Sequence, residues 1–255
     1  IIAECPQDKL DMERLYGAPS ERIEIAPCGF DPQELWPVPP RFARAQLGLS
    51  PDKFIVLQLG RMVPRKGVDT VIQGVALLRE RHGVDAELLV VGGEEQRRDG
   101  RESPELMRLR ALASELGVRE HVHFTGRKDR SELRDYYSAA DVFVTTPWYE
   151  PFGITPVEAM ACARPVIGAE VGGIKSTVVD GESGFLIPSR DPQALAERLA
   201  VLHNNPQLAQ CMGDEGLRRA YQHYTWRTVA RKAASIYATV VDGATVQPAP
   251  SFFEL

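Results

Sequence analysis

The sequence has no hydrophobic run long enough to cross a lipid bilayer, and it has only four cysteines in 255 residues. Its longest apolar runs, such as Phe54–Leu59 and Glu87–Val91, have the length of strands, whereas a membrane-spanning helix needs about 20 apolar residues. The cysteines are scattered without a Cys-x-x-Cys pair, which argues against a structural zinc site and a disulfide scaffold. No secretory signal peptide is visible. We therefore expect a soluble cytoplasmic protein without a transmembrane segment.

The sequence also lacks an excess of positive charge and the common nucleotide-binding motifs. Its formal net charge is -5, so no overall positive field favours nucleic acid as a partner. Neither the Walker pattern Gly-x-x-x-x-Gly-Lys-Ser/Thr nor the dinucleotide pattern Gly-x-Gly-x-x-Gly is present. His121 and His123 alternate on a predicted strand, but no third ligand is evident, so we expect no metal site.

What the sequence does contain is a regular alternation of strand-like and helix-like segments. Short apolar runs are typical of strands buried on both faces, and stretches with helical apolar spacing separate them. We predict strands at Phe54–Leu59, Glu87–Val91, His121–Phe124, Asp141–Thr145, Pro165–Gly168 and Phe185–Ile187. We predict helices at Val68–Arg81, Ser103–Gly117, the stretch after Asp129, Thr155–Arg164, Pro192–His203, Pro206–Tyr221 and Thr225–Val241. This alternation predicts an α/β fold with a doubly wound parallel sheet of Rossmann-like type.

The regular region spans residues 42–241, and three other segments surround it. Residues 1–30 hold one short strand-like run, Arg22–Ala26. Residues 31–41 are rich in proline and predict a linker, and residues 242–255 are expected to form a loose tail. Because the sequence begins without Met, we expect it to be a piece of a longer chain.

Local signals predict how two of the helices begin. Ser103 followed by Pro104 is typical of a capped helix start, and the polar stretch Glu94–Glu102 before it is expected to be a loop. Asp129, with Glu132 three residues later, predicts a capping box.

Ligands of doubly wound sheets lie beyond the carboxyl ends of the strands, so the loops that follow predicted strands are the candidate sites. The first loop, Gly60–Gly67, enters a helix and carries Arg61, Arg65 and Lys66. Gly60 would let the backbone approach a ligand, while Arg61 and Lys66 suit a diphosphate. A solvated basic turn is the alternative, and the residues alone leave both interpretations open.

The second loop follows Asp141–Thr145 and leads through Glu150 and Gly153 into a helix. Backbone amides at the start of that helix can face an anion or sugar hydroxyls. Glu150 suits sugar recognition because a carboxylate accepts hydrogen bonds from neighbouring hydroxyls; the alternative is a solvated loop residue. Glu158 ends the run Thr155-Pro156-Val157-Glu158, which is typical of a capping box. On the residues alone, a structural role is therefore the favoured interpretation for Glu158.

Two further loops follow predicted strands. Glu170–Lys175 contains Gly172-Gly173, and these paired glycines would either let the backbone pass close to a ligand or simply form a turn. Thr125–Lys128 contains Arg127 and would either contact a nucleobase edge or form ordinary surface.

The order of these motifs carries more information than any one of them. The sequence has, in order, Gly60-Arg61 with Lys66-Gly67, the run Glu150-Pro151-Phe152-Gly153-Ile154-Thr155-Pro156-Val157-Glu158, the pair Gly172-Gly173, and Asp180-Gly181-x-x-Gly184-Phe185-Leu186. The set resembles the GT4 family of retaining glycosyltransferases, or glycosyl transferases group 1, whose E-x7-E element matches Glu150 and Glu158. The resemblance covers nearly the whole chain and implies the C-terminal, donor-binding half of a GT-B fold.

The resemblance also implies a role for each matched residue. Arg61 and Lys66, beside Gly60, would hold the diphosphate of a nucleotide-sugar donor, and both would take part in catalysis together with Glu150. Glu150 would hold the transferred sugar, Glu158 the ribose hydroxyls and Arg127 the side of the base. The backbone that contacts sugar and phosphate would come from Phe152, Gly153, Ile154 and Thr155.

The family's chemistry is the transfer of a hexosyl group to an acceptor hydroxyl with retention of configuration, usually without a required metal or cofactor. A UDP-sugar is our first expectation for the donor, with GDP- and ADP-sugars left open. The alternatives are a sugar-nucleotide epimerase of the same fold and a non-catalytic nucleotide-sugar-binding domain.

The largest departure from the family pattern is a missing half. GT-B enzymes have two Rossmann-like domains, and residues 1–30 resemble only the last segment of the first, which recognises the acceptor. We therefore expect an unknown acceptor, little or no transferase activity from this chain alone, and any membrane association to be peripheral, through the missing N-terminal domain. Two smaller departures are Cys28, where Asn is common, and Ala163, where Gly is common.

Overall fold

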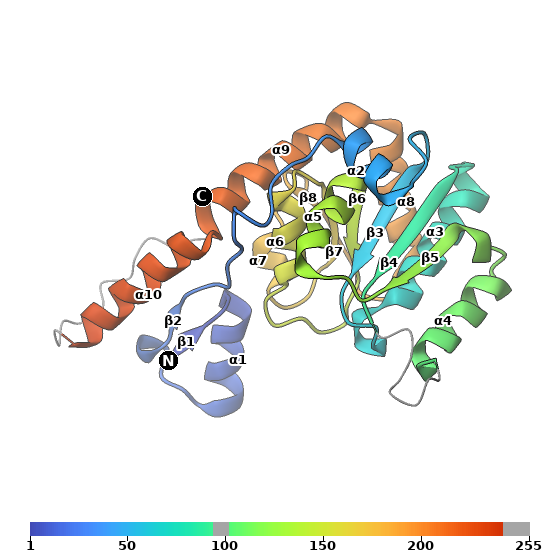
Figure 1. Ribbon diagram of the computed structural model, residues 1–255. Coiled ribbons are helices and arrows are strands. Elements are labelled where there is room, and N and C mark those ends of the chain that lie inside the picture. Colours follow the sequence, from blue (N-terminus) through green and yellow to red (C-terminus); the bar gives the residue numbers. More distant parts are fainter. Residues whose placement is uncertain (94–101, 242–255) are drawn as a thin grey trace.

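The structure is a computed structural model that describes residues 1–93 and 102–241 (Figure 1). The predicted tail at 242–255 and nearly all of the predicted loop Glu94–Glu102 lie outside the described residues. Six parallel strands form the main sheet in the order β5-β4-β3-β6-β7-β8. Their bounds are β3 Phe54–Leu59, β4 Ala86–Val91, β5 Val122–Gly126, β6 Val142–Thr145, β7 Val166–Ala169 and β8 Gly184–Ile187. The predicted doubly wound α/β fold is confirmed.

The central strands are rich in aliphatic residues, because a sheet covered by helices on both faces leaves these strands little contact with solvent. In β3, Ile55, Val56 and Leu57 are all buried, although their side chains alternate between the two faces. Val56 belongs to one hydrophobic cluster, whereas Ile55 and Leu57 belong to another. The sheet therefore separates two cores.

Helices cover each face of the sheet (Figure 1). One core contains residues of α3 (Val68–His82), α4 (Pro104–Glu115) and α8 (Pro192–Asn204). The other contains residues of α5 (Arg130–Ala139) and α6 (Ile154–Ala161), with α2 (Pro40–Leu47) packed beside α5. Helix α9 (Pro206–His223) packs on α6 and contributes to both cores, and the short α7 spans Ile174–Thr177. Single 3-10 turns occupy η2 (Pro64–Lys66) and η3 (Arg119–His121).

The two predicted helix starts are confirmed. The Ser103 hydroxyl accepts a hydrogen bond from the Leu106 amide at 3.2 Å. Asp129 and Glu132 form the reciprocal capping box at the start of α5, where the Glu132 carboxylate accepts from the Asp129 amide at 2.9 Å. Both caps satisfy amides that a helix leaves without an internal partner.

A small unit precedes the sheet (Figure 1). It consists of β1 (Ile2–Ala3), α1 (Pro6–Tyr16), η1 (Ser20–Arg22) and β2 (Glu24–Ile25), with β1 and β2 paired in parallel. The predicted run Arg22–Ala26 contains β2, but α1 was not predicted. Helix α2 begins at Pro40, inside the stretch interpreted as a linker.

The last described helix, α10 (Trp226–Val241), extends beside this small unit rather than over the sheet (Figure 1). Phe30 and Thr225 form an isolated parallel bridge; the Phe30 amide donates to the Tyr224 carbonyl at 2.8 Å, and the Trp226 amide donates to the Phe30 carbonyl at 3.0 Å. The segments before and after the sheet therefore meet at this bridge. Over residues 1–93 and 102–241, no helix has the length and apolarity needed to cross a membrane.

Candidate functional site

The order of the strands has its switch point between β3 and β6. These two strands are neighbours, but the helix that follows β3 packs on one face of the sheet and the helix that follows β6 packs on the other. Ligands of such sheets bind at this position, outside the carboxyl ends of the strands. The loops after β3 and β6 contact each other there. The Thr146 hydroxyl donates to the Gly67 carbonyl at 2.8 Å, and the Trp148 amide donates to the Arg65 carbonyl at 3.1 Å. The first two predicted loops therefore form one site.

An ion pair between Lys66 and Glu150 joins these loops. Their side chains are only 15% and 14% exposed. Arg65 donates to the Tyr149 carbonyl at 2.9 Å and lies 3.9 Å from the same Glu150 oxygen. Glu150 is thus a largely buried acid held by cations, and its interpretation as a solvated loop residue is wrong. Lys66 likewise does not lie in a solvated basic turn.

Glycines allow the loops around Glu150 to pack backbone against backbone. Gly172 has φ +49°, and a Cβ at this position would lie 1.7 Å from the Glu150 carbonyl oxygen. A Cβ on Gly173 would lie 2.3 Å from the Phe152 carbonyl oxygen, and the Gly173 amide donates to the Glu150 carbonyl at 3.1 Å. The paired glycines therefore bring the loop after β7 against the loop that carries Glu150, as only residues without a side chain can.

A cavity of about 590 Å³ opens at the carboxyl ends of β3, β4 and β5. It brings together three of the predicted site residues, Gly60, Arg61 and Arg127. Both arginines are exposed and form no hydrogen bond or ion pair with the described residues. The rest of the lining is Leu59, Met62, Val63, Val91, Gly92, Gly93, Ser103, Lys128 and Leu133. The cavity thus combines an apolar floor with unpaired cations, a combination that suits a nucleotide.

A second, smaller cavity of about 290 Å³ lies on the side of Glu150 that faces α1. Trp148, Tyr149, Glu170, Gly172 and Lys175 line it from the sheet domain, and Gln7, Asp8 and Asp11 line it from α1. Sequence reasoning missed the three α1 residues because it missed the helix. The available signal was Pro6 in the first helical turn with Gly17 as the C-terminal cap.

The start of α6 differs from the prediction. Gly153 is the N-cap, with φ +89° and no side-chain capping bond, so the helix begins at Ile154. Thr155 is then already inside the helix and Glu158 lies in its second turn, which makes the predicted Thr155–Glu158 capping box wrong. Phe152 is buried against Tyr224, with ring centroids 5.9 Å apart, while Ile154 and Thr155 are half-buried. Phe152, Gly153, Ile154 and Thr155 line neither cavity.

Glu158 instead faces α5. The Tyr137 hydroxyl donates to its Oε2 at 2.8 Å, and Arg130 Nη1 lies 3.5 Å from its Oε1. Glu158 is only 4% exposed, and burial raises the pKa of its carboxyl in spite of these two partners. Burial and the neighbouring carboxylate also raise the pKa of Tyr137 well above its usual value. Glu158 is therefore a buried acid whose surroundings favour the protonated carboxyl more than water does.

The structure thus brings the predicted residues into three adjoining groups rather than one. Gly60, Arg61 and Arg127 share the large cavity, and Lys66 and Glu150 form the ion pair. Glu158 lies in α6 and contacts Tyr137 and Arg130 of α5. All belong to loops or helix starts at the carboxyl ends of strands.

The model of the family described as glycosyl transferases group 1 matches residues 41–219. The chain belongs to this family. A relative named D-inositol 3-phosphate glycosyltransferase 2, from Catenulispora acidiphila, is 34% identical to this group 1 chain over 245 residues, which are 95% of this chain and 56% of the relative. The chain thus spans about half the length of the curated relatives it matches.

Two solved structures have a fold similar to that of this group 1 chain. Sucrose-phosphate synthase from Thermosynechococcus elongatus superposes with a TM-score of 0.84 and 35% identity, over 95% of this chain and 58% of that one. Anabaena HepE, solved in complex with UDP-glucose, superposes with a TM-score of 0.82 and 24% identity, over 93% of this chain and 63% of that one. The predicted GT4 resemblance and the predicted C-terminal half of a GT-B fold are confirmed.

Proposed function

We propose that this chain is the donor-binding part of a retaining glycosyltransferase, which transfers a hexosyl group from a nucleoside-diphosphate sugar to an acceptor hydroxyl. The observation that carries the proposal is the Lys66–Glu150 ion pair between the loops that follow β3 and β6. It places a phosphate-binding cation and a sugar-binding acid side by side, as a donor that carries a diphosphate and a sugar requires.

In this proposal the diphosphate binds between Arg61 and Lys66. Arg61 lines the large cavity without a partner among the described residues, so an anion would be its first charged contact there. The charge of Lys66 is already balanced by Glu150, and a diphosphate would compete with that acid for it. Arg127, across the same cavity, flanks the base.

The sugar end of the donor lies toward α6. Glu150 accepts hydrogen bonds from sugar hydroxyls, and the backbone of Phe152, Gly153, Ile154 and Thr155 offers the amides of a helix start to sugar and phosphate. Glu158 binds the ribose hydroxyls. This role rests on the family resemblance, in which the second acid of the E-x7-E element is Glu158, with seven residues between it and Glu150.

The proposed reaction forms a bond between the acceptor oxygen and the anomeric carbon on the face from which the diphosphate leaves. The bond between that carbon and the phosphate oxygen breaks, and the acceptor proton passes to the leaving phosphate. Arg61 and Lys66 stabilise the negative charge that develops on the diphosphate, and Glu150 positions the sugar. No step requires a metal ion.

UDP is the first nucleotide to test, because a structure with the same fold, Anabaena HepE, was solved with UDP-glucose. The acceptor would be recognised by a further domain of a longer chain, so we expect this chain to bind the donor without turning it over efficiently. The small unit of residues 1–30 would then be the last segment of that domain, residues 31–41 the linker and residues 42–241 the donor domain.

Calorimetric titration of the chain with UDP, GDP and ADP tests the proposal. We expect one nucleoside diphosphate to bind more tightly than the others, and Arg61→Ala to weaken it by about 1.5–3 kcal/mol, the contribution of a hydrogen bond to a charged group. Arg119→Ala is the matched control, since Arg119 is an exposed arginine outside both cavities. Failure to bind any of the three nucleotides would refute the donor site.

A further inference from the structure

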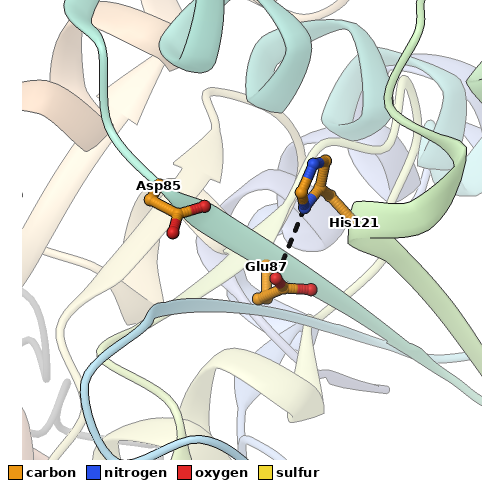
Figure 2. A group of neighbouring side chains, drawn as sticks. All are labelled: Asp85, Glu87 and His121. Carbon is orange, nitrogen blue, oxygen red and sulfur yellow. Dashed lines mark hydrogen bonds and ion pairs between the residues drawn. The ribbon is translucent and has the colours of Figure 1, made fainter.

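Two adjacent strands bring an acid between two histidines at the edge of the sheet. Strands β4 and β5 are parallel, with Leu88 opposite Val122 and Leu89 opposite His123. His121 is the last residue of η3 and directly precedes β5, and Glu87 on β4 contacts both His121 and His123. Asp85, two residues before Glu87, completes the group (Figure 2).

The side chains converge on Glu87. His121 Nδ1 lies 3.4 Å from Glu87 Oε1, and His123 Nε2 lies 2.5 Å from Glu87 Oε2. The ligand atoms of Asp85, Glu87 and His121 all lie within 4.8 Å of one another (Figure 2). In the sequence, the two histidines had no evident third ligand. The fold supplies Glu87 from β4 and Asp85 from the residue directly before β4. His121 and Glu87 are 34 residues apart in the sequence.

We propose that Asp85, Glu87 and His121 form a binding site for a divalent transition-metal ion of the zinc type. Zinc bonds to imidazole nitrogen and carboxylate oxygen are about 2.0–2.2 Å long, and at a tetrahedral angle they separate two ligand atoms by about 3.4 Å. The distance between His121 and Glu87 matches this separation. An imidazole ligand selects zinc over magnesium or calcium, which prefer oxygen ligands alone.

Each carboxylate oxygen of the site already has one partner. Lys53 donates to Oδ2 of Asp85, and Arg79 donates to its Oδ1 at 2.8 Å. Glu87 contacts His121 through Oε1 and His123 through Oε2. A carboxylate oxygen has two lone pairs, so each of these oxygens keeps one for a metal.

The surroundings set the properties of the site. His123 holds the second oxygen of Glu87, as hydrogen-bond partners of metal ligands commonly do. Lys53 and Arg79 add positive charge beside Asp85, so the affinity is weaker than that of a structural site made of cysteines. The Lys53 side chain would keep its contact with the Asp85 carboxylate, because the metal would bind lone pairs of Asp85 that Lys53 does not use.

The site is separate from the proposed donor site. Glu87 lies near the start of β4, whereas Gly92, which lines the large cavity, follows its end. Five residues of strand separate them by about 16 Å. A metal ion here would join η3, which directly precedes the edge strand β5, to the start of β4 without contacting the donor, and its effect would be on stability.

Zinc titration of the 255-residue chain by calorimetry tests the site. Every variant carries Cys211→Ser, because Cys211 is an exposed thiol that would bind zinc on its own. We expect one zinc ion per chain, with at least about tenfold weaker binding in both His121→Ala and His123→Ala. His82→Ala is the matched control, since His82 is an exposed histidine of α3, and it should leave binding unchanged.

Thermal unfolding provides the second measurement. Zinc should raise the unfolding temperature of the parent and of His82→Ala, and it should not raise that of Glu87→Gln, which keeps its size and its contact with His123. Unfolding without zinc shows that each variant is folded. Equal zinc affinity in the parent and His121→Ala, or no zinc binding at all, would overturn the proposal whatever the result of the nucleotide titrations.

Discussion

Lys66, in the loop after β3, forms an ion pair with Glu150, in the loop after β6, although 84 residues separate them. The proposed diphosphate and the acid therefore compete for one ammonium group. We predict that Glu150→Gln leaves UDP binding as tight as in the parent or tighter, because the competing charge is gone. The same variant should remove the extra affinity of UDP-glucose over UDP, because the amide no longer offers a charged acceptor to the sugar hydroxyls.

Lys66→Ala should act differently from Glu150→Gln. It removes a phosphate contact and leaves Glu150 partly buried with only Arg65 at 3.9 Å, so UDP and UDP-glucose should both lose about 1.5–3 kcal/mol of binding free energy. Calorimetry of both ligands on both variants separates the two roles. If Glu150→Gln weakened both ligands by one common factor, Glu150 would not be contacting the sugar.

Gly172 and Gly181 form a natural comparison for the close packing around Glu150. Both have positive φ, +49° and +81°, but a Cβ on Gly181 would meet nothing within 4 Å, whereas one on Gly172 would lie 1.7 Å from the Glu150 carbonyl oxygen. Gly181→Ala should cost about 1–2 kcal/mol of unfolding free energy from backbone strain alone. Gly172→Ala should cost more and should also weaken UDP-glucose binding. Urea unfolding curves and calorimetry check both values, and equal costs would contradict the clash.

Glu158 should make stability depend on pH. Burial raises its pKa in the folded chain above the unfolded value of about 4.3, so the folded state binds the proton more tightly. The cost of the charge is fully present above the folded pKa and disappears as the pH falls below the unfolded pKa. We predict that Glu158→Gln is more stable than the parent at neutral pH and that this advantage vanishes in acid.

Urea unfolding across this pH range measures the effect of Glu158→Gln. Glu120→Gln is the control, because the side chain of Glu120 is 88% exposed and should show no such advantage. A Glu158→Gln variant that is less stable than the parent at neutral pH would mean that the contacts with Tyr137 and Arg130 outweigh the cost of burying the charge.

Arg44 should be among the most costly charged residues to remove. Its side chain is 7% exposed; it pairs with Asp141 at 2.8 Å and donates to the carbonyls of Ala139, Pro51 and Lys53. Arg44→Ala leaves the Asp141 carboxylate, whose pKa burial already raises, without its guanidinium, and should cost about 3–5 kcal/mol of unfolding free energy. Arg41→Ala, on the exposed start of the same helix, should change stability by no more than about 0.5 kcal/mol. Urea unfolding compares the two.

The strands could be predicted because their signal is local. Phe54–Leu59 reads as a buried strand from its own residues, and β3 has these bounds. The order of the strands carries no such signal, since the pairing of β3 with β6 follows from the direction in which each connection crosses the sheet. Helix α1 was missed for a related reason: it has no buried residue, so apolar spacing could not reveal it.

The candidate site was predictable as a set of loops and not as a set of contacts. Gly60, Arg61 and Arg127 were chosen because they follow strands, and they line one cavity because parallel strands end at one edge. The partners of Glu158 lie on another helix, with Tyr137 21 residues earlier, and no local pattern points to them. The capping box failed because Gly153 starts the helix earlier than Thr155.

The bridge between Phe30 and Thr225 has a practical consequence for protein engineering. The two ends of the intervening polypeptide are already adjacent in space, which is the condition that circular permutation and insertion into a host protein require. New termini in an exposed loop of the sheet region, with a short linker between Phe30 and Thr225, would keep the strands β3 to β8 of the main sheet in their order. The six-stranded sheet can therefore be handled as a transplantable module.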